Sequence, residues 1–341
     1  MKIGIEVDER IFQETLDVVF SIEKEKSLDE ILVELLSNKV YTSDVLFILL
    51  QKLSKEGYIF SDLNKIRKER DIEEEKKKEI LNYLKNKVEN VAKNKIFFSS
   101  LDISKFSQCP RRFFLEKVVK SQQKKTQSSL EGEVFHRASY LLVKNYNKIP
   151  LEQLISQVSE GVLTEFKNKV KVEKSAILSS LGFLDEFIRR HEFKFLIPEP
   201  KIISIKSGLI ASPDLIGITE NEIIPIDLKM GSLRVKDALK IQLLSEVVVV
   251  ENFFKKEVNS AMIVSLLKRK VFKLKVSQEE KQKVYIIKRQ IERSLLSNKI
   301  FPISNLPNFR KLICPFCHVK DICDEIERVK KILSKPFQEF S

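Results

Sequence analysis

The sequence predicts an α/β protein, with a core in which helices flank a mixed sheet and a mostly helical region ahead of it. Two patterns indicate this class. Short apolar runs rich in isoleucine and valine begin near residue 202 and are bounded by polar, turn-forming residues, as strands are. Longer stretches with apolar residues three and four positions apart lie before, between and after these runs, as amphipathic helices require.

The first 60 residues are expected to be helical. Two apolar stripes recur at helical spacing, and Ser27 is a suitable N-cap for the second. The stripes are formed by Ile11, Leu16, Val19 and Phe20, and by Leu28, Ile31, Leu32, Leu35 and Leu36. A third apolar stretch begins at Val45 and stops before Gly57, after which Tyr58 to Phe60 has strand character. This order is similar to a winged-helix core, and a small helical bundle is the alternative.

Residues 61–98 are expected to form a charged connecting helix. Glu and Lys between Asp71 and Glu79 can form several i,i+4 pairs on an exposed helix. The apolar seam beside them is thin and consists of Ile72, Ile80, Leu81, Leu84 and Val88. The chain therefore divides into regions 1–60, 61–98 and 99–341.

The third region holds the predicted core. Helices are expected over 102–107, 110–118, 130–146, 151–169, 173–192, 235–253 and 277–298. Strands are expected over 202–205, 208–211, 223–229, 261–266 and 271–274.

The charge is distributed unevenly along the chain. Residues 1–100 contain 18 basic and 20 acidic side chains, whereas residues 101–341 contain 43 basic and 28 acidic ones. A net charge of +15 on the second part indicates a polyanionic partner such as DNA. A Lys-rich genome or a thermophilic source is the alternative, but it does not easily explain the asymmetry.

The sequence contains no signal for a membrane. No apolar run approaches the about 20 residues that span a bilayer. Acidic residues interrupt the start of the chain at once, which does not suit a signal peptide. We therefore expect a soluble, cytoplasmic protein.

Four cysteines occur at two distant places. Cys314, Cys317 and Cys323 lie within ten residues near the C-terminus, and Cys109 lies more than 200 residues earlier. A disulfide framework does not suit a large intracellular protein, so the pattern indicates a metal site. A Cys₄ zinc site is one possibility, although structural zinc sites more often use two paired knuckles.

Two aspartates and a lysine form the candidate catalytic group. Asp214 and Asp227 are thirteen residues apart with a turn between them, which is hairpin spacing. Strand alternation puts Asp227 and Lys229 on one face. Paired carboxylates bind Mg²⁺ or Mn²⁺, and a nearby lysine can orient the attacking water. A charged strand residue that faces solvent is the ordinary alternative, but Asp227 follows a strongly apolar run.

These residues resemble the motif of the PD-(D/E)xK superfamily of RecB-like nucleases. Gly132 and His136 resemble the family's Gly-x-x-x-His helix, and Gln242 resembles the glutamine of its Gln-x-x-x-Tyr motif. Glu246 stands where the tyrosine is expected, which puts in doubt the contact that the tyrosine would make. Glu199 stands near a position where many members carry an acidic residue.

The resemblance implies a restriction-endonuclease-like core and assigns roles to these residues. His136, Asp214, Asp227 and the backbone carbonyl of Leu228 would hold Mn²⁺ or Mg²⁺. Lys229 would assist the attacking water, and Gln242 would position the substrate or the lysine.

The cysteines, one before the core and three after it, resemble the iron–sulfur branch of this superfamily, which includes the CRISPR-associated RecB-like exonucleases. The resemblance implies a [4Fe–4S] cluster on Cys109, Cys314, Cys317 and Cys323. Such a cluster would join the two ends of the nuclease domain, and we expect its loss to loosen the whole domain.

The implied function is a DNA exonuclease acting on single-stranded DNA or DNA ends, in CRISPR adaptation and antiviral defence, with CRISPR integration proteins as partners. A repair nuclease of the same superfamily and a non-catalytic iron–sulfur DNA-binding protein are the alternatives. Candidate phosphate contacts are Arg111, Arg112, Lys268, Arg269 and Lys270. Candidate base-stacking residues are Phe113, Phe114 and Phe135, for which core packing is the ordinary alternative.

Overall fold

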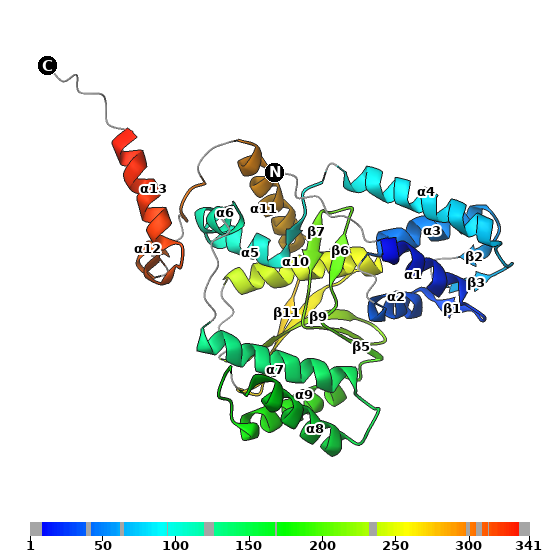
Figure 1. The fold of residues 1–341 in the computed structure, drawn as a ribbon, viewed down its shortest axis with the longest axis horizontal. Coiled ribbons are helices and arrows are strands. Elements are labelled where there is room, and N and C mark those ends of the chain that lie inside the picture. Colours follow the sequence, from blue (N-terminus) through cyan, green and yellow to red (C-terminus); the bar gives the residue numbers. More distant parts are fainter. Residues whose placement is uncertain are drawn as a thin grey trace.

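The fold is known from a computed structural model (Figure 1). It describes residues 9–38, 42–61, 65–93, 95–118, 126–167, 169–231, 237–297, 301–304, 309–312 and 314–333. Among the helices so described, none is long and apolar enough to cross a membrane.

The N-terminal unit combines four helices with a small sheet. Its elements are α1 (Glu9–Phe20), β1 (Lys26–Ser27), α2 (Leu28–Ser37), α3 (Ser43–Lys55), β2 (Ile59–Ser61), β3 (Lys65–Lys68) and α4 (Glu74–Ala92). Ser27 caps α2 in a complete capping box with Glu30, which explains where that helix begins. The three strands are ordered β1-β3-β2. In the charged segment 61–98, the helix begins only at Glu74, and β3 lies ahead of it.

The second part of the described chain begins with a short strand, which is followed by five helices and then by five strands in a row. One helix, two strands and three further helices complete it. The helices are α5 (Ser100–Gln108), α6 (Pro110–Val118), α7 (Gln127–Lys144), α8 (Leu151–Phe166), α9 (Lys174–His191), α10 (Asp237–Phe254), α11 (Gln278–Leu296), α12 (Phe309–Leu312) and α13 (Lys320–Leu333), with a 3₁₀ turn η1 (Cys314–Phe316). The strands are β4 (Phe98–Ser99), β5 (Phe195–Pro198), β6 (Ile202–Ser204), β7 (Leu209–Ala211), β8 (Leu215–Ile218), β9 (Ile223–Lys229), β10 (Ser260–Ser265) and β11 (Lys270–Lys275).

The central sheet is mixed, as expected for an α/β core. Its order is β11-β10-β9-β8-β5, in which β9 and β10 are parallel and the other pairs are antiparallel. Strands β6 and β7 instead join β4 in a separate three-stranded sheet. The sequence pattern identifies β6 and β7 as strands but does not place them outside the central sheet.

Helices cover both faces of the central sheet (Figure 1). Ile224, Ile226 and Leu228 of β9 pack in one apolar cluster with α7, α8 and α9. Residues of the opposite parity, such as Ile223, pack in the second cluster with α5, α10 and α11. Asp227 shares this second parity, so its side chain leaves the sheet on the side of α10.

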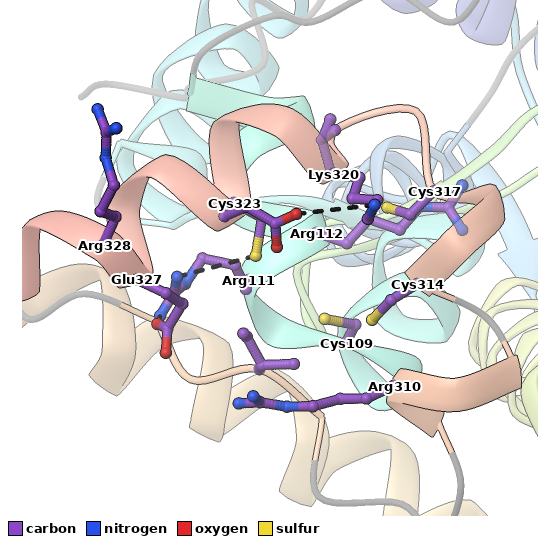
Figure 2. A pocket seen from close by; sticks show the side chains of 13 residues that line it. Cys109, Arg111, Arg112, Arg310, Cys314, Cys317, Lys320, Cys323, Glu327 and Arg328 are labelled. Carbon is purple, nitrogen blue, oxygen red and sulfur yellow. Dashed lines mark hydrogen bonds and ion pairs between the residues drawn. The ribbon is translucent and has the colours of Figure 1, made fainter. Parts of the chain in front are cut away.

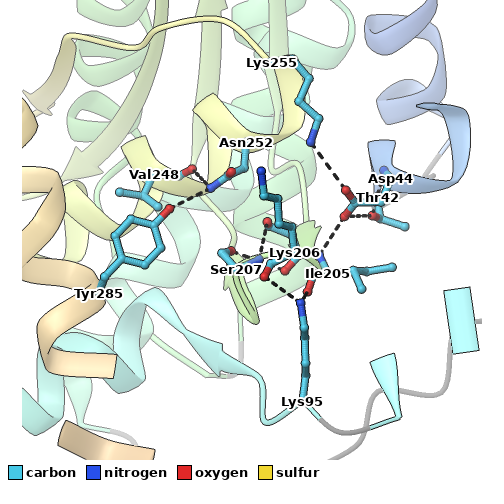
Figure 3. A network of polar contacts seen from close by, with 11 residues as sticks. Thr42, Asp44, Lys95, Ile205, Lys206, Ser207, Val248, Asn252, Lys255 and Tyr285 are labelled. Atoms are coloured by element: carbon cyan, nitrogen blue, oxygen red, sulfur yellow. Dashed lines mark hydrogen bonds and ion pairs between the residues drawn. The ribbon is translucent and has the colours of Figure 1, made fainter. Parts of the chain in front are cut away.

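The N-terminal unit is docked on the core through α3 (Figure 3). Asp44, in the first turn of α3, accepts a hydrogen bond of 2.9 Å from the backbone N–H of Ile205. Its other oxygen lies 3.5 Å from Lys255 Nζ at the end of α10. Lys95 Nζ donates to the carbonyls of Ile205 and Lys206 at 2.9 and 2.8 Å. The turn between β6 and β7 is thus held from two sides.

Candidate active site and cysteine cavity

The two aspartates lie at neighbouring strand positions. Antiparallel pairing sets Leu215 of β8 opposite Ile226 of β9, and one further step in this register sets Asp214 opposite Asp227. Asp214 Oδ2 accepts a hydrogen bond of 2.6 Å from the backbone N–H of Leu228. The hairpin spacing in the sequence therefore brings the two aspartates together as predicted.

Lys229 and Asp227 interact directly. Lys229 Nζ lies 2.8 Å from both oxygens of Asp227 and hydrogen bonds to Oδ1. Asp227 is only 4% exposed, and its Oδ2 has no hydrogen-bond partner among the described residues. Burial raises the pKa of Asp227 to about 6, opposed by the charge of Lys229. The ammonium of Lys229 therefore only partly offsets the cost of burying this carboxylate.

His136 on α7 completes the group. Its Nδ1 lies 3.1 Å from Asp214 Oδ1, and the hydrogen bond to Asp214 raises the pKa of this histidine. Glu199 follows β5, and its backbone N–H donates to the carbonyl of Asp214 at 2.8 Å. Partial desolvation and the charge of Asp214 raise the pKa of the Glu199 carboxyl. The sequence pattern did not predict strand β5, but this strand is the element that brings Glu199 beside Asp214.

Glu246 on α10 is an additional acidic group that the sequence motif did not predict. It is 2% exposed and accepts a hydrogen bond of 3.1 Å from Gln242 Nε2. Its Oε2 has no hydrogen-bond partner in the described part of the chain. Burial, together with the charge of Asp227, raises the pKa of Glu246 to about 8. The Gln242 side chain thus contacts Glu246, one helical turn away.

His136, Asp214 and Asp227 are residue types that bind divalent cations, but their side chains are not arranged around one point. Within the described ranges, no three His, Cys, Asp or Glu side chains are placed to hold one metal ion. At this site Lys229 Nζ pairs with the Asp227 carboxylate, and Asp214 contacts His136 Nδ1 and accepts a hydrogen bond from the Leu228 N–H. Asp227 Oδ2 is buried and accepts no hydrogen bond from the described residues, although it lies 2.8 Å from Lys229 Nζ, and it is an oxygen ligand of the kind that Mg²⁺ and Mn²⁺ prefer.

The raised pKa of Glu246 predicts a pH dependence of stability. The folded protein holds a proton on Glu246 that the unfolded chain, with its ordinary pKa of 4.5, has released. Stability of the metal-free protein should therefore fall as pH rises from about 4.5 to about 8, because the unfolded state binds fewer protons there. Thermal unfolding measured across this range should show that the unfolding temperature depends less on pH in Glu246→Gln than in wild type. The exposed control Glu220→Gln should have the wild-type pH dependence. An unchanged slope in Glu246→Gln would contradict the assignment.

The four cysteines line one cavity of about 460 Å³ (Figure 2). Cys109 lies between α5 and α6, Cys314 and Cys317 lie at and just after η1, and Cys323 lies on α13. All four are free thiols. Their sulfur atoms face the middle of the cavity, and those of Cys109 and Cys314 lie beside one another. The fold thus brings together residues that are more than 200 positions apart.

The thiols are close enough to affect one another. Burial and the neighbouring Cys109 and Cys317 raise the pKa of Cys314. Burial also raises the pKa of Cys323, opposed by Arg111. Sulfur ligands bind metals as thiolates, so any metal group held by these cysteines would have to displace their protons. Four cysteine thiols that line one cavity are the donor set that an iron–sulfur group requires.

Some of the residues predicted to contact phosphates or stack on bases are exposed, and others are buried. Arg111 is 1% exposed, so the expectation that it contacts phosphates is wrong, because its guanidinium is used inside the protein. Arg112 pairs with Glu116 at 2.7 Å, and Arg269 pairs with Glu186 at 3.0 Å. Lys268, Arg269 and Lys270 are exposed at the β10–β11 turn. Phe113 and Phe135 are buried, and Phe114 stacks on Phe301, so these three rings pack against other parts of the protein.

An α/β sheet that carries two carboxylates and a lysine at one edge is suited to divalent-cation chemistry on phosphodiesters. The chain belongs to the PD-(D/E)XK nuclease superfamily, whose family model matches residues 98–324. Members of this superfamily cleave phosphodiester bonds and use divalent metals such as Mg²⁺ or Mn²⁺. The match covers the candidate active site and all four cysteines, and leaves out the N-terminal unit.

Two further comparisons add little. No curated protein matches the chain. Among solved structures, the one described as "Crystal structure of SSO0001" is similar at 15% sequence identity, covering 71% of this chain and 93% of that chain. Its TM-score is 0.34, which is too low to support a conclusion about this protein.

Proposed function

We propose that this protein is a metal-dependent DNA exonuclease that acts on single-stranded DNA or DNA ends. The observation that carries the proposal is the meeting of Asp214, Asp227, Lys229 and His136 at one edge of the sheet, in a chain of the nuclease superfamily. The net charge of +15 after residue 100 supports a polyanionic substrate.

The residues take distinct parts in this proposal. His136, Asp214, Asp227 and the backbone carbonyl of Leu228 would hold Mg²⁺ or Mn²⁺. A divalent cation, when bound, polarises the phosphodiester and lowers the pKa of a water molecule. Lys229 orients the attacking water and stabilises charge that develops on the phosphate oxygens. Gln242 positions the substrate or the lysine.

We propose that the cysteine cavity holds a structural [4Fe–4S] cluster on Cys109, Cys314, Cys317 and Cys323. A single zinc ion needs four sulfur atoms about 2.3 Å from one point. All four thiols line one cavity, yet among the described residues no three such side chains are placed to hold a single ion, which favours the larger group.

We propose that the N-terminal unit is a winged-helix-like module. The order α1, β1, α2, α3, β2, β3 and the sheet order β1-β3-β2 support this. Helix α3 packs toward the core through Asp44 and borders a cavity between the two parts, together with Lys95 and Lys255. In this arrangement α3 is not free to enter a DNA groove, so we infer that the module braces the nuclease part or binds a protein.

The biological setting that we propose is CRISPR adaptation, in which a cytoplasmic nuclease trims DNA ends before integration and works with the integration proteins. The motif set and the arrangement of one cysteine before and three after the core support this setting.

A digestion assay on end-labelled DNA tests the activity. Purified protein is incubated with single- and double-stranded DNA labelled at either the 5′ or the 3′ end, with Mn²⁺, Mg²⁺ or a chelator. We expect cleavage with either metal, none with the chelator, and a preference for single strands, with the label showing the polarity. DNA binding without metal-dependent cleavage would contradict the enzyme and favour a non-catalytic DNA-binding protein.

A further inference from the structure

Arg111 is the most deeply buried cation beside the cysteine cavity. It lies on α6, two residues after Cys109, and is 1% exposed. A guanidinium keeps its charge at any pH that a protein tolerates, so a buried one needs fixed partners. Identifying those partners shows what this residue does.

Among the described residues, the partners of the Arg111 guanidinium and backbone N–H belong to the C-terminal part of the chain. Its Nε donates to the carbonyl of Phe301, and its backbone N–H donates to the carbonyl of Pro302 at 3.0 Å. Its Nη2 donates to Glu327 at 3.1 Å, and its Nη1 points at the sulfur of Cys323 at 4.0 Å (Figure 2). One residue therefore joins the helix that follows the first cysteine to the helix that carries the last.

This contact with sulfur is suited to the ligating form of Cys323. A neutral thiol is a weak acceptor, whereas a thiolate accepts a charge-assisted hydrogen bond. Groups that hydrogen bond to metal ligands fix their orientation and tune the metal, and hydrogen bonds to cluster sulfur atoms influence the reduction potential. The guanidinium of Arg111 is a planar fork of donors, and Glu327 and Phe301 hold two of its nitrogens, so that the third is directed at the sulfur of Cys323.

We infer that Arg111 is the positioning residue of the cysteine cavity, holding Cys323 beside Cys109 and donating a hydrogen bond to its sulfur in the loaded protein. This inference rests on the proposed iron–sulfur cluster. It gives Arg111 a role in the cofactor site in place of the phosphate contact expected from the sequence.

The test compares Arg111→Lys with Arg328→Lys in the full-length protein. Lysine keeps the positive charge but cannot reach Phe301, Glu327 and Cys323 together. Arg328 also lines the cavity, but its side chain is exposed and pairs with Glu325 at 2.8 Å, so it is a matched control. After anaerobic reconstitution, iron and acid-labile sulfide per chain, the rate of cluster loss to a chelator, and the reduction potential are measured.

Arg111→Lys should lose its cluster about 10–100-fold faster than wild type, the usual cost of removing a group that supports a metal ligand. Its reduction potential should shift to more negative values, because a hydrogen bond that favours the reduced cluster is gone. Arg328→Lys should match wild type in both. A purely structural role would change cluster retention without moving the potential of the loaded fraction.

Three results would overturn the inference, and they differ from one another. If Arg111→Lys matches wild type in both the rate of cluster loss and the reduction potential, this inference is overturned, but the proposed cluster and the proposed nuclease are not. A changed rate with an unmoved potential leaves Arg111 as a packing residue and overturns the hydrogen bond to sulfur. Wild type that binds no iron overturns the cluster and this inference with it, while the DNA digestion assay still judges the nuclease separately. If Arg111→Lys folds poorly by circular dichroism, Glu327→Gln replaces it and should give smaller changes in the rate of cluster loss and in the reduction potential, in the same directions. An unchanged rate and potential in Glu327→Gln would then contradict the inference.

Discussion

Asp227→Asn should lose DNA cleavage by at least about 10²–10³-fold, the cost of removing one preorganised charge from an active site. Asparagine keeps the shape of the side chain at a position that is 4% exposed, so the sheet should remain intact. It removes the carboxylate that a cation would bind and the partner that holds Lys229 at 2.8 Å. Initial rates on end-labelled single-stranded DNA in Mn²⁺ measure the loss, and gel-shift binding should be largely unchanged.

A matched control separates this effect from the general cost of altering a buried aspartate. Asp185 on α9 is also buried, where it accepts hydrogen bonds from Tyr146 at 2.6 Å and Arg189 at 3.1 Å. Asp185→Asn should therefore affect stability more than cleavage. Lys229→Ala should lose cleavage while keeping the aspartates for the cation. Undiminished cleavage by pure Asp227→Asn protein would remove the basis of the proposed active site.

The sequence predicted the parts of this site that depend on local pattern. Strand β9 begins and ends where the apolar run and its Asp-x-Lys ending predict, at Ile223 and Lys229. The hairpin spacing predicted that Asp214 and Asp227 would meet, because an antiparallel register needs only the turn and the alternation of side chains. His136 reaches the same edge from α7 and contacts Asp214.

Other features depend on distant partners and were not predicted. Strand β5 includes Pro198, and β8 is only four residues long with Gly217 inside it, so neither has a strong strand pattern. Gly217 fits because the ring of Phe193 occupies the place of a Cβ, at 2.3 Å. Phe193 lies between α9 and β5, so this contact arises only when β5 has paired with β8.

The two buried ionisable side chains illustrate the same limit. Glu246 and Arg111 look like ordinary polar helix residues in the sequence. Their burial is decided by what lies opposite each helix, which is the sheet for Glu246 and the C-terminal segment for Arg111. A signal was present for both, because Glu246 departs from the family motif and Arg111 stands two residues from a cysteine.

Loss of the cysteine site should loosen the C-terminal segment and leave the central sheet folded. From the sequence alone we expected the whole nuclease domain to loosen, because the cluster closes a loop of more than 200 residues. In the described part of the chain, the two apolar clusters that build the core contain no residue beyond Phe301. Val319 is buried in this segment, and polar contacts such as that between Arg111 and Glu327 attach it.

Hydrogen exchange of Cys314→Ser measures this expected difference. Amides of residues 309–333 should lose most of their protection, because few apolar contacts remain to hold a segment without its cofactor. Amides of β9 and β10, whose side chains pack on both faces of the sheet, should exchange as in wild type. Wild type stripped of iron is the matched comparison and should give the same pattern. If β9 and β10 lose protection as well, the cluster supports the whole domain, as the loop length alone would predict.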